Sequence, residues 1–243
     1  MIIRNIRAHQ EGDTYRMLAD VAYETRPVTE TLVMSVPAAH AGWFHPSPHA
    51  FLAASSMAAL WHGEPRIALD DTVDAQLGER LGLAMRYLRH GHRSAGPVPQ
   101  IEAPRTPAGW RTPTQTATAI LLSGGVDSTA ALHRNAATHA PDDPRRIRVA
   151  FFAHGLDVGD PNKKDRPDVW ALGIERLDAL CRTLGIVLVP VSVNFRNLEK
   201  HWHFYAEWQF GSLLAAIAHA AGTRVFRCII APDNDLEHTD QTP

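Results

Sequence analysis

The residue types that bind phosphate groups come together in one hexapeptide, Ser123-Gly124-Gly125-Val126-Asp127-Ser128. Two adjacent glycines let the backbone turn sharply and approach a ligand closely. Serine hydroxyls and backbone N–H groups can donate hydrogen bonds to phosphate oxygens. Asp127 offers a carboxylate that could help hold Mg²⁺ or could cap a helix, and both roles stay open. The hexapeptide, called here the 123–128 loop, therefore predicts a binding site for the phosphates of a nucleotide.

The segments on either side of the 123–128 loop must position it. The apolar run over 117–122 is short and ends in turn residues, so it predicts a buried strand. An alanine-rich stretch over 127–137 follows and predicts a helix, which Asp127 or Ser128 could cap. A strand, a tight loop and a helix N-terminus direct N–H groups and the helix dipole at one spot. This arrangement favours phosphate binding.

The residue spacing of this loop differs from that of two common nucleotide-binding loops. A Walker A loop needs Gly-Lys-Ser/Thr, and no lysine follows the glycines here. The Gly-x-Gly-x-x-Gly spacing of dinucleotide folds is also missing. The loop instead resembles the Ser-Gly-Gly-x-Asp-Ser loop of the PP-loop ATP pyrophosphatases, or adenine nucleotide α-hydrolases. Three further elements resemble the N-terminal extension of PP-loop proteins similar to 7-cyano-7-deazaguanine synthase: Ser35-Val36-Pro37, His49-Ala50-Phe51-Leu52-Ala53 and Gly63-Glu64.

The resemblance implies ATP and Mg²⁺ as cofactors, with Asp127 as the Mg²⁺ ligand. Arg196 follows the third predicted strand of the C-terminal portion, where its guanidinium suits phosphate or carboxylate recognition. We expect Asp127 and Arg196 to be the catalytic residues. Asp157 could bond a ribose hydroxyl or a magnesium water, or it could cap a turn. The residues implied to bind the nucleotide are Ser123, Gly124, Gly125, Val126, Asp127, Ser128, His154 and Gly155.

The implied reaction is ATP-dependent adenylation of a carboxylate or amide-like oxygen with release of pyrophosphate. Amide or nitrile formation, as in 7-cyano-7-deazaguanine synthase, would follow. The substrate would be a small-molecule or peptide carboxylate, and a homodimer is left open. Two alternatives stay open as well, a non-catalytic ATP- or AMP-binding module and a truncated inactive homologue.

Composition restricts the class of protein. The 243 residues include 26 acidic and 24 basic ones, so no net charge favours nucleic acid or an anionic membrane. No apolar run approaches the ~20 residues of a membrane span, so we expect no membrane association and a cytoplasmic protein. Two cysteines, Cys181 and Cys228, cannot form a disulfide framework or a four-thiolate zinc site, and no zinc site is evident.

A stretch rich in proline, a residue that interrupts helices and strands, divides the chain into three parts. A proline-rich linker is predicted over 96–116, between a smaller N-terminal α+β portion over 1–95 and a nucleotide-binding domain over 117–243. The end of the chain carries no helix or strand signal, so we expect this domain to be incomplete at its C-terminus. In the N-terminal portion we predict strands over 31–36, 66–69 and 98–102 and helices over 48–61 and 73–88.

The nucleotide-binding domain alternates strands and helices. Near-continuous apolar runs predict strands covered on both faces, and helices between them predict an α/β, doubly wound parallel sheet. The expected strands span 117–122, 147–153, 186–193 and 224–231, and the expected helices span 127–137, 168–184 and 201–221. Ligands in such folds bind outside the carboxyl ends of the strands. Tyr205, Trp208 and Phe210 are expected in the core rather than in a base-stacking platform.

Overall fold

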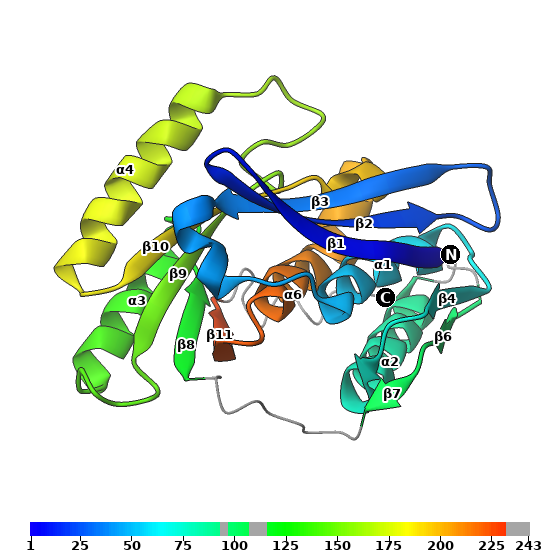
Figure 1. The fold of residues 1–243 in the computed structure, drawn as a ribbon, viewed down its shortest axis with the longest axis horizontal. Helices are drawn as coiled ribbons and strands as arrows, with labels where there is room; N and C mark the ends of the chain where they lie inside the picture. The colour runs from blue at the N-terminus through cyan, green and yellow to red at the C-terminus, as the bar shows by residue number, and fades with distance from the viewer. Residues whose placement is uncertain (93–96, 107–115, 232–243) are drawn as a thin grey trace.

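The computed structural model describes residues 1–92, 97–106 and 116–231. Within these ranges the protein is an α/β protein with one nine-stranded mixed sheet (Figure 1). Its order is β11-β8-β9-β10-β3-β2-β1-β4-β6. The strands are β1 (Ile2–Glu11), β2 (Thr14–Ala22), β3 (Thr29–Pro37), β4 (Arg66–Leu69), β6 (Gln100–Glu102), β8 (Ala117–Leu121), β9 (Ile147–His154), β10 (Val187–Val193) and β11 (Val225–Ile230). A separate two-stranded sheet pairs β5 (Val73–Asp74) with β7 (Arg105–Thr106).

Six α-helices are present in the described part of the chain. They are α1 (Pro48–Trp61), α2 (Ala75–Gly91), α3 (Val126–Thr138), α4 (Pro167–Thr183), α5 (Trp202–Phe204) and α6 (Phe210–Ala220). Three shorter helical segments are η1 (Ala38–Trp43), η2 (Phe195–Leu198) and η3 (Tyr205–Gln209). Side chains from α1 and α6 pack in the apolar core on one face of the sheet, and side chains from α3 and α4 pack in a second core on the other face. Figure 1 shows α3 and α4 beside β8–β10.

Strand direction differs between the two ends of the sheet. Strands β11, β8, β9 and β10 are parallel to one another, as expected for the C-terminal portion. The pairs β10–β3, β3–β2 and β2–β1 are antiparallel, and β1–β4 and β4–β6 are parallel. The parallel sheet expected over 117–243 is therefore one part of a larger sheet, which is mostly parallel but mixed. Strands from both portions of the chain join in it, through the contact of β10 with β3.

Successive side chains of β8 pack against the helices on the two opposite faces of the sheet. Ala117, Ala119 and Leu121 belong to the apolar core shared with α1 and α6. Ile120 packs in the second core, with Leu132 of α3 and other side chains of that face. Successive side chains of a strand point to opposite faces, so a strand buried on both sides is apolar at nearly every position, and Thr118 is the one polar residue of β8.

Strand β8 also marks the point where the chain reverses its direction of travel across the sheet. The next strand along the chain, β9, lies on one side of β8, and β11 lies on the other. Crossovers that leave in opposite directions open a crevice outside the carboxyl ends of the strands. The 123–128 loop follows β8 directly and lies at this switch point.

Several predicted elements are confirmed, one predicted helix is interrupted, and one hairpin was not predicted. The helix over 48–61 and the strand over 66–69 match α1 and β4 in both bounds. The hairpin of β1 and β2 was not predicted, because only one face of these strands is buried and β1 carries a bulge between Arg4 and Arg7. The helix over 201–221 is interrupted by the π-helical segment η3, in which the Phe210 N–H donates to the Tyr205 carbonyl.

Some predictions fall wholly or partly outside the described residues. These are residues 96 and 107–115 of the predicted linker and the C-terminal residues 232–243. Among the helices that the structure describes, none has the length and apolar character that crossing a membrane requires.

Candidate functional site

A cavity of about 270 Å³ opens at the carboxyl ends of β8, β9 and β11. The 123–128 loop forms one wall of this cavity. Its polar lining residues are Ser123, Ser128, Asp127 and Asp157, and its apolar lining residues include Phe151, Phe152, Leu156, Val158, Phe210, Leu214 and Ile230. One side is thus polar and the rest apolar, which is the usual make-up of a small-molecule pocket.

The 123–128 loop is held by hydrogen bonds between its own residues. The hydroxyl oxygens of Ser123 and Ser128 lie 3.0 Å apart. The Gly125 N–H donates to Ser123 Oγ at 3.3 Å, and Ser128 Oγ donates to the Gly125 carbonyl at 3.2 Å. These contacts fix the turn between β8 and α3 without filling the cavity beside it.

The N-terminus of α3 presents free backbone donors. Gly125 is the N-cap residue and provides no side-chain cap, so the expectation that Asp127 or Ser128 caps the helix is wrong. Asp127 instead lies in the first turn, exposed to solvent. The N–H groups of Val126, Asp127 and Ser128 find no acceptor among the described residues, as expected for the first turn of a helix. They provide a cluster of donors and a positive helix end.

Two glycines are required by the backbone around the cavity. Gly124 has φ +81°, in the left-handed region that L side chains rarely adopt. Gly155 has φ +94°, and a Cβ there would lie 1.8 Å from the Val193 carbonyl oxygen. Gly155 therefore brings the loop after β9 against the end of β10, and it is not among the residues that line the cavity.

Two carboxylates face the cavity, on Asp127 and Asp157. Tyr205 Oη donates a hydrogen bond to Asp157 Oδ1 at 3.0 Å. Burial, together with the charge of Asp157, raises the pKa of Tyr205 above its usual value, so the phenol remains a donor. No lysine, arginine or histidine is among the described lining residues. Phosphates bound here would be neutralised by backbone dipoles and by a bound cation.

Asp127 and Asp157 could share the cation with phosphate oxygens, because Mg²⁺ commonly takes one or two protein carboxylates and keeps other positions for phosphate and water. The described residues contain no group of three or more His, Cys, Asp or Glu arranged to hold a metal by themselves. The donor set therefore suits Mg²⁺ bound together with a nucleotide better than a permanent metal site.

Arg196 lies outside the set of residues that line the cavity. Its side chain is only 1% exposed, and its Nη1 donates to the Leu156 carbonyl and pairs with Asp160 Oδ1, each at 2.9 Å. The guanidinium carbon lies 4.0 Å from the centre of the Tyr205 ring. Arg196 thus fixes the loop that carries Leu156, rather than facing the cavity itself.

His154 is also absent from the cavity wall. Its Nε2 lies 3.3 Å from Asp165 Oδ1, and its ring packs against Trp170 with centroids 5.0 Å apart. A Cβ on Gly159 would lie 2.3 Å from the His154 ring, so this glycine makes room for the histidine. Gly124 and Val126 are the two residues of the 123–128 loop that do not line the cavity, and the Val126 side chain points into solvent and is 83% exposed.

Sequence reasoning missed part of the apolar wall. Tyr205 and Trp208 are buried as expected, but Phe210 is only partly buried and lines the cavity with Leu214. Ile230, at the end of β11, is 46% exposed and completes this wall. The sequence signal for Ile230 was its place near the end of the predicted strand over 224–231. No signal marked Phe210, because the sequence predicted a continuous helix over 201–221.

Comparisons with family models, with curated proteins and with solved structures give no match to this chain. The residues of the cavity and their arrangement are therefore the basis on which a function can be inferred.

Proposed function

We propose that the cavity beside the 123–128 loop binds ATP and that the protein adenylates a carboxylate with release of pyrophosphate. The observation that carries this proposal is the N-terminus of α3, whose free N–H groups adjoin two serine hydroxyls at the edge of an apolar cavity. Phosphates would bind to the donors, and the adenine ring would contact the apolar wall formed by Phe210, Leu214 and Ile230.

We also propose that the protein belongs to the PP-loop superfamily and that its C-terminal strands form a doubly wound sheet of the adenine nucleotide α-hydrolase type. Four parallel strands in the order β11-β8-β9-β10, with helices on both faces, support this assignment. The loop sequence, and the place of the loop at the switch point that this strand order creates, also support the assignment.

Mg²⁺ is the proposed partner of ATP in this site. When bound, it would screen the triphosphate from Asp127 and Asp157 and withdraw charge from the departing pyrophosphate. Asp127 would hold the ion. Ser123, Ser128 and the N–H groups at the start of α3 would hold the phosphate oxygens and stabilise the charge that develops on them.

The proposed reaction has two steps. An oxygen of the substrate carboxylate forms a bond to the α-phosphorus of ATP, and the bond from that phosphorus to the bridging oxygen of pyrophosphate breaks. Ammonia or an amine then attacks the carbonyl carbon of the acyl adenylate, loses a proton, and displaces AMP. The AMP retains one oxygen of the original carboxylate. Proximity and charge stabilisation supply the catalysis, so no general base is required for the first step.

Isotope transfer tests the reaction. The protein is incubated with ATP, Mg²⁺, ammonium and a panel of carboxylic acids labelled with ¹⁸O, and AMP and pyrophosphate are measured by mass spectrometry. We expect AMP that carries one ¹⁸O, with formation strongly reduced in Asp127→Ala and Ser123→Ala. Thr129→Ala, one residue beyond the loop, is the matched control and should keep the wild-type rate.

The outcomes separate the alternatives. Labelled AMP supports adenylation, and unlabelled AMP shows hydrolysis of ATP by water. Binding of ATP without AMP formation supports a non-catalytic nucleotide-binding module. Equal turnover by Asp127→Ala, Ser123→Ala and the wild type would refute the role of the loop.

A further inference from the structure

A second, larger cavity lies at the opposite end of the sheet, between α2 and the segment that contains β6 and β7. Its volume is about 730 Å³, within the range of ~300–1,000 Å³ typical of small-molecule sites. In the order of the sheet, six strands separate β6 from β8. The cavity is therefore distinct from the one beside the 123–128 loop.

One face of α2 forms the floor of this cavity. The lining residues of the helix are Ala75, Gly78, Glu79, Gly82, Arg86 and Arg89, which recur at intervals of three or four positions. Residues at this spacing lie on one side of a helix. Gly78 and Gly82 carry no side chains, so they leave room for arginine side chains above the helix.

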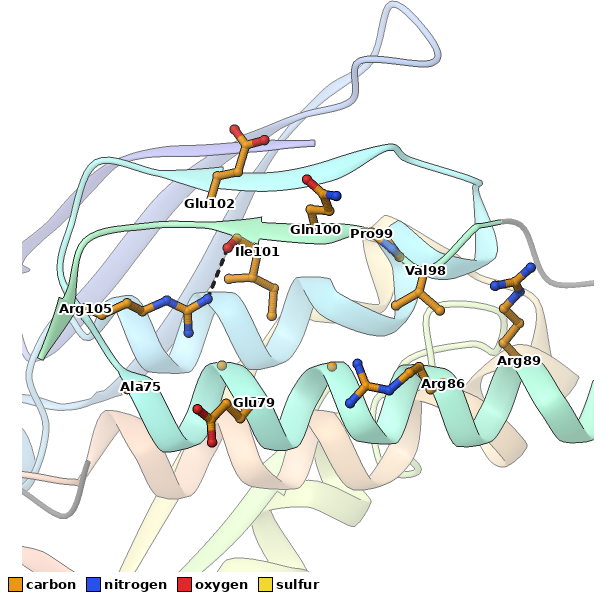
Figure 2. Close-up of a pocket in the computed structure, with 12 residues that line it drawn as sticks. Ala75, Glu79, Arg86, Arg89, Val98, Pro99, Gln100, Ile101, Glu102 and Arg105 are labelled. Carbon is orange, nitrogen blue, oxygen red and sulfur yellow. Dashed lines mark hydrogen bonds between the residues drawn. The ribbon is translucent and has the colours of Figure 1, made fainter. Parts of the chain in front are cut away.

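Arginines extend into this room from both ends, as Figure 2 shows. The guanidinium of Arg105 lies directly over Gly78, where a Cβ would be 1.5 Å from Arg105 Nη1. Arg105 Nη2 donates to the Ile101 carbonyl at 3.0 Å, which leaves its other N–H groups available. Arg86 extends toward Arg105 above Gly82, and a Cβ on that glycine would lie 3.5 Å from Arg86 Nη1.

The cavity carries an excess of positive charge. Arg86 and Arg89 form no hydrogen bond or ion pair with another residue in the described ranges. Glu102 points to the other side of β6, where Arg66 Nη1 donates to it at 2.8 Å (Figure 2). The lining residues include two glutamates and three arginines, Arg86, Arg89 and Arg105, and of the glutamates only Glu79 has no arginine partner outside the cavity in the described part of the chain.

We propose that this cavity binds a phosphorylated small molecule through Arg86, Arg89 and Arg105. Guanidinium groups pair with phosphate oxygens through two parallel hydrogen bonds, and several of them around one cavity suit a ligand that carries more than one negative charge. The side chains of Val98 and Ile101 supply the apolar contact surface for the remainder of the ligand. This proposal does not depend on ATP binding by the 123–128 loop.

Calorimetric titration with inorganic tripolyphosphate, without Mg²⁺, tests the proposal. The parent protein carries Ser123→Asp, because a carboxylate at this exposed position repels phosphate from the 123–128 loop. We expect saturable binding, weakened about tenfold for each guanidinium removed in Arg86→Gln and Arg89→Gln. All three arginines are exposed, so these variants retain the fold.

Arg80→Gln is the matched control, because Arg80 is exposed on α2 and does not line the cavity. It should bind tripolyphosphate as the parent does. Titration with the tricarboxylate tricarballylate gives the second comparison, and weaker binding than tripolyphosphate is expected. No saturable binding to the parent, equal losses in Arg80→Gln and Arg86→Gln, or tighter binding of the tricarboxylate would each overturn the proposal.

Discussion

The hydroxyl of Tyr205 donates a hydrogen bond to Asp157 Oδ1 at 3.0 Å and thereby links the π-helical segment η3 to the rim of the cavity. The ring of Tyr205 is buried, whereas Asp157 is exposed. A buried phenol therefore holds an exposed carboxylate in place. If Asp157 contributes to binding of ATP and Mg²⁺, the bond should matter for affinity as well as for stability.

We expect Tyr205→Phe to lower the free energy of unfolding by about 1 kcal/mol, because one hydrogen bond is lost from an otherwise unchanged ring. We also expect weaker binding of Mg²⁺-ATP, measured by calorimetry. Tyr15→Phe is the control, since the Tyr15 hydroxyl makes no hydrogen bond in the described structure. Unchanged affinity in Tyr205→Phe would show that the position of Asp157 is not needed for binding.

The buried ion pair between Arg196 and Asp160 gives a prediction about stability. Their side chains are 1% and 2% exposed, and Nη1 and Oδ1 lie 2.9 Å apart. Removing one partner leaves a buried charge uncompensated, which costs about 3–5 kcal/mol. We expect Asp160→Asn to lower the free energy of unfolding in urea by about this amount. The exposed pair Arg166 and Asp168 provides the control, because Asp168→Asn should change stability little.

A histidine group between α1 and α6 should make the protein sensitive to acid. Burial, and then the charge of His49, lower the pKa of His219 to about 4, although Asp74 acts in the opposite direction. The rings of His49 and His219 have centroids 5.9 Å apart. Burial also lowers the pKa of His49 and of His45.

The sign of the effect follows from these shifts. An unfolded histidine titrates near pH ~6.5, so below that pH the unfolded chain binds a proton that folded His219 excludes. Stability should therefore fall between pH ~6.5 and the folded pKa of about 4, by about 3 kcal/mol from His219 alone. Urea midpoints at a series of pH values measure this. His219→Gln should flatten the profile, and His9→Gln, at an exposed position, should leave it steep.

The sequence predicted the C-terminal elements well because their signals are local. Continuous apolar runs identified β8, β9, β10 and β11, and the glycine pair identified the turn into α3. Strand β1 gave no such signal, because most of its residues are exposed or partly exposed and only Ile3 is buried. The contact of β10 with β3 joins residues about 160 positions apart, and no periodicity encodes it.

The candidate site, like the fold, was predicted only where the signal in the sequence is local. Ser123, Asp127 and Ser128 were predicted from one motif and all line the cavity. Arg196 was chosen for its place after a strand, yet the structure buries it against Asp160. The sequence does not show in which direction a side chain at a strand end points. Phe210 reaches the cavity through the π-helical segment, and a continuous helix would have rotated it differently.

Gly155 provides a test of the loop after β9. Gly155→Ala would place a Cβ 1.8 Å from the Val193 carbonyl oxygen, in a backbone conformation with φ +94°. Gly185 is the control, since it has φ +69° but nothing within 4 Å of the added Cβ. Gly185→Ala should cost about 1–2 kcal/mol for the left-handed conformation alone. We expect Gly155→Ala to cost clearly more in thermal or urea unfolding, and equal losses would contradict the close approach to β10.

The most direct test of phosphate binding by the 123–128 loop is calorimetry of Mg²⁺-ATP with Gly124→Asp and Gly124→Asn. The two side chains have the same shape, and both tolerate the left-handed backbone of Gly124 better than other residues do. They differ in charge, and a carboxylate at this position repels phosphate. We expect saturable binding to the wild type, reduced binding to Gly124→Asn and none to Gly124→Asp. Equal affinity of the two variants, or of all three proteins, would show that the triphosphate does not bind at this loop.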